Sequence, residues 1–232
     1  MDKFDVTFKA FGNQAILLEW PNKVDENILD NIINFLPSIL SHEQSALSNF
    51  TSGYNSILLQ YHSVFDTRKK GQSLLSLYKS IERKNEYIPK SWQIPVCYEE
   101  RYGFDISSFA NRGLNTKEVI NLHTSKPYRV FMIGFLPGFI YLGGLPPKLH
   151  MDRKKNPRNN IPKGSIAIGG EQTGIYPMDS PGGWQIIGRT PLSLFDLSKK
   201  KPSLISQGDY IHFYAIDQDE YQNLSSRQSQ KQ

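Results

Sequence analysis

Apolar residues recur three or four positions apart in two stretches near the start of the chain. The first stretch follows Asp25, which is suited to cap a helix, and carries Ile28, Leu29, Ile32, Ile33, Leu36 and Leu40. The second follows Asp66 and carries Leu74, Leu75, Leu77, Tyr78 and Ile81. Because this spacing places the apolar side chains on one face of a helix, it predicts two amphipathic helices.

Strand-like runs accompany these helices, at residues 3–9, 14–20, 46–51 and 56–62. Turn residues join them in pairs, with Gly12-Asn13 in the first pair and Gly53-Tyr54-Asn55 in the second. Strands on one side and helices on the other form an α/β layer, in an order that resembles a ferredoxin-like sandwich. We therefore predict an α/β N-terminal domain over residues 1–88, ending in a charged linker.

Short strands and turns dominate the rest of the chain. The clearest strand-like runs lie at residues 91–98, 128–133 and 210–216. Many short strands separated by Gly and Pro turns favour a closed barrel over a sandwich of long strands. The expectation is an α+β protein in which residues 89–216 form a β-barrel domain.

Two short helices and a polar tail complete the expected layout. A helix is expected from Asp105 until Gly113, a residue that commonly ends helices. Asn115 and Glu118 form a capping-box pattern ahead of another helix. The segment 217–232 is polar, and we expect it to be a disordered tail.

Composition and charge exclude several classes of protein. The chain has 232 residues, 38% hydrophobic and 21% charged, which is typical of a folded globular protein. A net charge of +5 is mild, and without a nucleic-acid motif we expect no nucleic-acid partner. The single cysteine, Cys97, fits a reducing compartment and a buried, inert thiol. No apolar run approaches the ~20 residues of a membrane span, so we expect a cytoplasmic protein without a signal peptide.

The block from Gly134 to Asp196 is unusually rich in turns. Pro137-Gly138 and Pro181-Gly182 each suit a type II turn, and paired glycines let the backbone approach a neighbour or ligand closely. Uncharged residues whose side chains could hydrogen-bond a small polar ligand lie beside these turns: Gln172, Thr173, Tyr176 and Ser180. At Gly182 and Gly183 the backbone itself could approach such a ligand. The alternative is that the glycines and prolines only shape the barrel.

Basic residues provide a second candidate feature. Residues 148–163 carry Arg153 and Arg158 among six cations against the single acid Asp152, which suggests capture of a carboxylate or phosphate. A solvated basic loop is the plainer alternative. Arg189 follows two isoleucines and should have a partner, while Trp184 could stack on a ligand or belong to the core.

Common catalytic motifs are absent from the sequence. There is no GxxxxGK[ST] phosphate loop, GxGxxG, GxSxG or HExxH, and the histidines are scattered. We therefore expect no bound metal, and the sequence alone assigns no catalytic residue.

The turn-rich block closely resembles one known family. The runs GFLPGFIYLGGLP, IGGEQTGIYP and SPGGWQIIGRTP are similar to the KipI / allophanate hydrolase subunit 1 family. The similarity is weaker upstream of these runs, and the resemblance as a whole covers about residues 1–215. The family's stand-alone bacterial members are described as the B subunit of an ATP-dependent 5-oxoprolinase. The chain departs from the family pattern at loop positions, including Glu99-Glu100, Phe104, Ile140 and Lys163.

The resemblance implies an α/β N-terminal domain followed by a cyclophilin-like β-barrel. It also implies partners, the KipA-like C subunit and the A subunit of the enzyme, which together with this chain open 5-oxoproline to glutamate at the expense of ATP. Arg153, Arg158 and Arg189 would then hold anionic groups beside the amide-bearing turns. An alternative from a different class is a binding module that inhibits a sensor histidine kinase, as some relatives do. Prolyl isomerase activity is a third idea that rests on the barrel alone.

Overall fold

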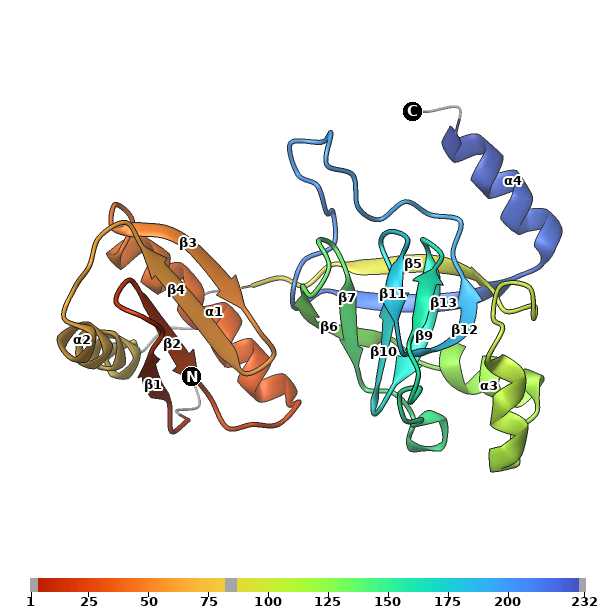
Figure 1. Cartoon of the computed structure of the whole chain (residues 1–232), viewed down its shortest axis with the longest axis horizontal. Coiled ribbons are helices and arrows are strands. Elements are labelled where there is room, and N and C mark those ends of the chain that lie inside the picture. The colour runs from red at the N-terminus through yellow and green to blue at the C-terminus, as the bar shows by residue number, and fades with distance from the viewer. Residues whose placement is uncertain (1–3, 82–86, 230–232) are drawn as a thin grey trace. The chain divides into compact units, whose positions relative to one another are not determined.

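The computed structural model describes residues 4–81 and 87–229. The chain divides into two compact units, Met1–Ile88 and Pro89–Gln232, which are considered separately (Figure 1). Within the described ranges, no helix is long and apolar enough to cross a membrane.

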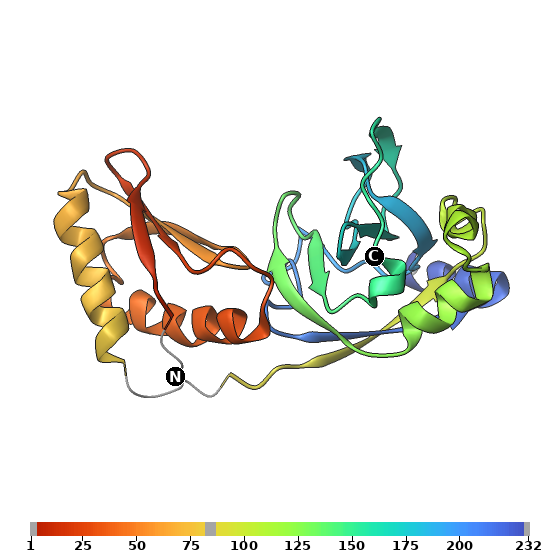
Figure 2. The same ribbon diagram turned by 90° about the horizontal axis from the view of Figure 1, so that it is seen from below.

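The N-terminal unit is an antiparallel sheet covered by two helices (Figure 2). Its sheet has the order β1-β2-β4-β3, and the elements are β1 (Thr7–Ala10), β2 (Ala15–Glu19), α1 (Glu26–His42), β3 (Leu47–Ser52), β4 (Ser56–Tyr61) and α2 (Thr67–Ser80). The chain order ββαββα becomes the βαββαβ order of a ferredoxin-like fold when β1 is counted last. The expected sandwich is therefore present with its first strand permuted.

Local sequence signals define both helices of this unit. The Asp25 carboxylate accepts hydrogen bonds from the first amides of α1, and Asp66 does the same for α2. The buried face of α1 includes Phe35 and Ile39. By contrast, the predicted face residues Ile33, Leu36 and Leu40 are only half-buried, because the face that meets the sheet is rotated slightly from the one predicted.

The second unit is built on a closed barrel. Its strands follow the order β10-β7-β6-β13-β5-β12-β9 and comprise β5 (Ser91–Cys97), β6 (Tyr128–Ile133), β7 (Ile140–Gly143), β9 (Ser165–Gly169), β10 (Gln172–Ile175), β12 (Gln185–Arg189) and β13 (Tyr210–Ile216). The pairing of β13 with β5 is parallel, whereas the other barrel pairs are antiparallel. The mixed α/β class and the barrel expected from the sequence are both confirmed.

One end of the barrel core contains a buried histidine. The residue is His123 of α3 (Thr116–Thr124), a helix that begins with the capping box predicted at Asn115 and Glu118. The short 3-10 helix η1 (Ile106–Arg112) precedes it and ends at Gly113. The His123 ring is fully buried and stacks on Tyr128 and Phe213, two residues of the barrel core.

An outer ribbon of two paired strands covers one side of the barrel. This outer ribbon consists of strands β8 (Arg158–Ile161) and β11 (Ser180–Gly182), which pair with each other although β9 and β10 lie between them in the sequence. The short 3-10 helix η2 (Pro147–Leu149) precedes both strands. Side chains alternate along β9, so that Ile166 and Ile168 face the barrel core while Ala167 faces outward. The outward side chains form a second core, made of Phe139, Ile161, Ala167, Tyr176, Trp184 and Ile186.

The C-terminal segment differs from the expectation of a disordered tail. Residues Gln218–Ser229 form helix α4, which follows directly after β13 (Figure 1). Tyr221 stacks on Tyr102 at 4.3 Å between ring centroids, and Leu224 packs on the same small cluster as Cys97. These few apolar contacts hold a helix whose sequence is otherwise polar, which is why composition alone suggested disorder.

Candidate functional site

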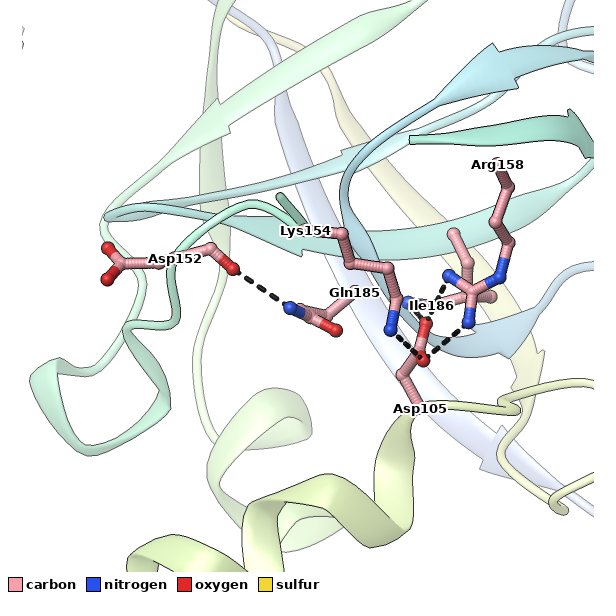
Figure 3. A network of polar contacts seen from close by, with 6 residues as sticks. All are labelled: Asp105, Asp152, Lys154, Arg158, Gln185 and Ile186. Carbon is pink, nitrogen blue, oxygen red and sulfur yellow. Dashed lines mark hydrogen bonds and ion pairs between the residues drawn. The ribbon is translucent and has the colours of Figure 1, made fainter. Parts of the chain in front are cut away.

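The candidate site lies where the outer ribbon, strand β12 and the loop before η1 meet. Its centre is Asp105, whose side chain is only 3% exposed. Arg158, at the start of β8, donates to both carboxylate oxygens, from Nη1 to Oδ2 at 2.9 Å and from Nη2 to Oδ1 at 2.7 Å. Lys154 Nζ adds an ion pair to Oδ1 at 2.8 Å (Figure 3).

The backbone of β12 completes the environment of this carboxylate. The Ile186 N–H donates to Asp105 Oδ2 at 2.8 Å, and the Asp105 N–H donates to the Ile186 carbonyl at 2.9 Å (Figure 3). Burial by itself acts to raise the pKa of Asp105. The hydrogen bonds from Arg158, Lys154 and the Ile186 amide outweigh burial, so the pKa lies below its ordinary value. Asp105 is therefore a permanent anion at neutral pH.

Positive charge exceeds negative charge in this cluster. Two cations share one carboxylate, and their side chains remain 27% exposed for Lys154 and 29% exposed for Arg158. The Arg158 guanidinium also lies over the Phe104 ring, with its central carbon 4.7 Å from the ring centroid. A guanidinium has further N–H donors beyond those used on one carboxylate. The cluster can therefore attract a second anion, such as a carboxylate or a phosphate.

A neighbouring surface combines aromatic rings with another arginine. Arg153 lies over Trp184, with its central carbon 5.6 Å from the ring centroid, and Trp184 makes an edge contact with Tyr141 at 5.6 Å. Trp184 is 5% exposed, so it belongs mainly to the outer core, as the plainer alternative held. The Lys154 N–H donates to the Gly183 carbonyl at 2.6 Å, which ties the arginine-bearing segment to this surface.

Glycines allow the two large aromatic residues of the outer core to pack closely. A side chain on Gly169 would overlap the Trp184 indole, and one on Gly182 would overlap the Tyr176 hydroxyl. Both glycines thus serve close approach to a neighbour inside the protein. Burial raises the pKa of Tyr176 to about 12, so its hydroxyl stays neutral.

Gln172 lies on the same outer face of the barrel as Trp184. It pairs in register with Gly169, the residue against which the indole packs. The register of β8 with β11 places Arg158 opposite Gly182, two residues before Trp184. The structure therefore brings Gln172, Arg158 and Trp184 to one side of the barrel.

Besides Tyr176 and Trp184, two more of the sequence-predicted site residues are enclosed by the protein. Thr173 is fully buried, where its hydroxyl donates to the Ala167 carbonyl and contacts His123 Nε2 at 3.0 Å. Ser180 is 7% exposed within β11. The contacts of Thr173 give it a structural role in the barrel core, whereas the buried Ser180 hydroxyl has no hydrogen-bond partner among the described residues.

Arg189 lies away from the Asp105 cluster. It ends β12, about 10 Å along the strand from Ile186, whose backbone contacts Asp105, and its Nε donates to the Lys163 carbonyl at 2.7 Å. Arg189 also acts to lower the pKa of Tyr221 in α4, against the larger effect of burial. The expected partner is thus a backbone carbonyl, and Arg189 is separate from Arg153 and Arg158.

The central carboxylate and one of its cations were absent from the sequence-based set of site residues. From the sequence, Asp105 is expected only to begin a short helix, and Lys154 is only one charge in a basic segment. Their partnership joins positions about 50 residues apart, which no local motif reveals. Among the described residues, no cluster of three or more His, Cys, Asp or Glu side chains could hold a metal ion.

Comparison with known proteins assigns the family. Residues 6–205 match the family described as carboxyltransferase domain, subdomain C and D. The chain belongs to this family. The 5-oxoprolinase B subunit from Bacillus subtilis is 32% identical over 231 residues, which cover 92% of this chain and 94% of that protein. A protein of the same name from Escherichia coli O157:H7 is 46% identical over 136 residues, covering 58% of this chain and 61% of that protein.

A solved structure agrees with the fold. The crystal structure of the K. lactis urea amidolyase superposes with a TM-score of 0.77 at 21% identity, over 94% of this chain and 15% of that one. At this identity the likeness supports the fold alone. None of these relatives is named as a kinase inhibitor, so they add no support to that alternative.

Proposed function

We propose that this chain is the B subunit of an ATP-dependent 5-oxoprolinase, which opens the cyclic amide of 5-oxoproline to give glutamate. The observation that carries the proposal is the 32% identity to a 5-oxoprolinase B subunit over 94% of that protein's length. The family match over residues 6–205 includes residues of both units of the chain and also supports the proposal. We place the protein in the cytoplasm, with the KipA-like C subunit and the A subunit of the enzyme as partners.

Opening the ring of 5-oxoproline requires a site that recognises anions, and the Asp105 cluster supports that role. A lactam is a weak electrophile, and phosphorylation of its oxygen would activate it for ring opening. The substrate carries a carboxylate, and both the activated intermediate and the ring-opening transition state carry negative charge. Cationic donors fixed in advance stabilise such charge without reorganising during the reaction.

The three cations of this surface, Arg153, Lys154 and Arg158, have two different roles in this proposal. Lys154 and Arg158 are held by Asp105, which fixes their positions and leaves the cluster with excess positive charge. Arg153 is exposed and spans the Trp184 ring, so its guanidinium is accessible to a ligand carboxylate. Arg153 is therefore the residue that we assign to direct contact with the substrate anion.

We expect the ATP site to be formed by this chain together with its partner subunits. The cationic donors of this cluster fit phosphate oxygens, but the sequence contains no GxxxxGK[ST] loop of the kind that cradles nucleotide phosphates. We therefore derive no step through ATP from this chain and expect that the isolated chain is inactive. The base that promotes attack on the ring is also assigned to a partner.

Reconstitution tests the proposed function. The chain would be combined with purified A and C subunits, and ATP hydrolysis that depends on 5-oxoproline would be measured together with glutamate formation. We expect both activities only when all three proteins are present. Equal activity in mixtures that lack this chain would remove the proposal, as would activity of the complete mixture that does not depend on 5-oxoproline.

A further inference from the structure

The two edges of the N-terminal sheet differ in how they are protected. At one edge, β1 carries Lys9, which forms an ion pair with Glu19 at 2.7 Å. At the other edge, β3 has the sequence LSNFTS, with no charged residue and no proline. Natural proteins usually guard a sheet edge with charge, proline or a covering segment, because its unpaired backbone groups can bind another strand.

An aromatic side chain on β3 is left partly uncovered. Phe50 pairs in register with Leu59, which is fully buried under the helices, so the two side chains share the helix-facing side of the sheet. Phe50 is nevertheless 39% exposed, because β3 is the last strand and the helical layer does not reach over it. One more strand beside β3 would extend the sheet and cover this ring.

A groove beside β3 could accept side chains of such a strand. It has a volume of about 550 Å³ and runs between the end of α1 and β3, lined by Leu40, Ser41, Gln44, Leu47, Ser48, Asn49 and Phe50. None of its lining residues is charged. By contrast, the groove beside β1 includes Asp5 and Lys79. An edge strand next to a groove is the arrangement in which one chain adds a strand to another.

The lack of charge favours a second copy of this chain as the occupant. A two-fold interface brings each surface against itself, so charges near the axis would face their own kind and repel. The chain carries a net charge of +5, which adds long-range repulsion between copies and leaves a neutral patch as the favoured contact. A different partner could use complementary charges for specificity, and β3 offers none.

We propose that β3 pairs antiparallel with β3 of a second copy, joining two N-terminal sheets into one continuous sheet. The bulge in β3 lies between Leu47 and Asn49, at the start of the strand, so Asn49–Ser52 remain regular and available for pairing. In this pairing the helix-facing side chains of each copy, Phe50 among them, lie beside the groove of the other.

Charge placed on β3 tests the pairing. Asn49 and Thr51 are exposed and pair in register with Gln60 and Leu58, so N49K/T51K adds four like charges per dimer without altering the core. The variant also removes the exposed hydrogen bond from Asn49 to Gln60 and changes one residue that lines the groove. Sedimentation equilibrium on the full chain should give a dimer for the wild type. We expect the double variant to raise the dimer dissociation constant at least tenfold. The matched control T7K, which adds a lysine to the opposite edge, should leave it unchanged.

A charge-swap experiment separates direct pairing from a general effect of charge. N49D/T51D should also weaken self-association, but an equal mixture with N49K/T51K should form heterodimers at least as tightly as the wild type forms dimers. A monomeric wild type at all concentrations would overturn the proposal, and so would a dimer that both variants leave intact. Protection of residues 47–52 from hydrogen exchange only after the C subunit is added would also overturn it, and would assign this edge to that partner. None of these outcomes depends on 5-oxoprolinase activity.

Discussion

Arg158 and Asp105, 53 positions apart in the sequence, form a two-point contact with oxygen–nitrogen distances of 2.7 and 2.9 Å. This contact fastens the outer ribbon to the loop that precedes η1. Lys154 shares the same carboxylate, so the pair also fixes a second cation on the surface. A single buried anion thereby positions the basic segment that the proposed function requires.

Replacing Asp105 should destabilise the barrel unit strongly. The variant D105N leaves Arg158 and Lys154 without their anion, and breaking a partly buried ion pair from one side commonly costs about 3 kcal/mol. Urea unfolding monitored by tryptophan fluorescence would measure the change. The control K155A removes an exposed cation of the same segment and should lie within about 0.5 kcal/mol of the wild type. Equal stability of D105N and the wild type would contradict the structural role of this contact.

The same carboxylate predicts a loss of stability in acid. The folded-state pKa of Asp105 is lowered, so its contribution is fully present above the unfolded value of about 3.9 and is lost as pH falls through the lower folded value. The difference in unfolding free energy between the wild type and D105N should therefore shrink as pH falls below about 4. A difference that stays constant from neutral pH to pH 3 would contradict this assignment.

His123 predicts a separate pH dependence at less acidic pH. Its environment fits the neutral ring: Tyr98 O–H lies 2.7 Å from Nδ1, and Thr173, which donates its own proton to Ala167, can only accept from Nε2. Burial lowers the pKa of His123 to about 3. The unfolded chain takes up a proton below about pH 6.5 and the folded chain does not, so stability falls with decreasing pH in this window.

The variant H123Q should remove this dependence, because glutamine does not titrate. We expect the unfolding free energy of the wild type to fall by up to about 1.4 kcal/mol per pH unit more than that of H123Q between pH 6 and 4. Urea unfolding at several pH values measures the two slopes. Parallel slopes for the two proteins would show that His123 is protonated in the folded state.

Adjacent glycines should respond differently to the same substitution. A methyl group at Gly182 would overlap the Tyr176 hydroxyl and Ile161, whereas one at Gly183 would make only ordinary contacts with Lys154 and Pro157. G182A should therefore lose about 1–3 kcal/mol of stability, and G183A should be close to the wild type. Thermal unfolding of both variants checks this, and equal melting temperatures would show that the outer core is packed more loosely than described.

Elements defined by local signals were predictable from the sequence. The strands at residues 128–133 and 210–216 have the predicted bounds, and the caps Asp25, Asp66 and Asn115 each begin a helix as expected. In these cases, a few consecutive residues supply both the apolar period and the cap. These strands and helices form as predicted because the local sequence is sufficient to specify them.

The helix α4 and the Asp105 cluster could not be predicted, because both depend on distant contacts. The polar helix is held by Tyr221 against Tyr102, more than a hundred positions earlier. The glycine pairs signalled close approach correctly, but the sequence did not reveal that their neighbours are Trp184 and Tyr176. Thr173 was predicted as a ligand contact from its position among turns, yet strand alternation directs it into the barrel.

The central claim is that this chain binds the substrate anion of a 5-oxoprolinase through Arg153. The variant R153A leaves the Asp105 ion pairs intact, because Arg153 contacts the Trp184 ring and not that carboxylate. Its direct test is the KM for 5-oxoproline in the reconstituted complex, with K155A as the matched control from the same segment. We predict that R153A raises KM at least tenfold, equivalent to about 1.4 kcal/mol, while K155A leaves it within twofold. An unchanged KM for R153A in a complex that K155A also leaves active would contradict the claim.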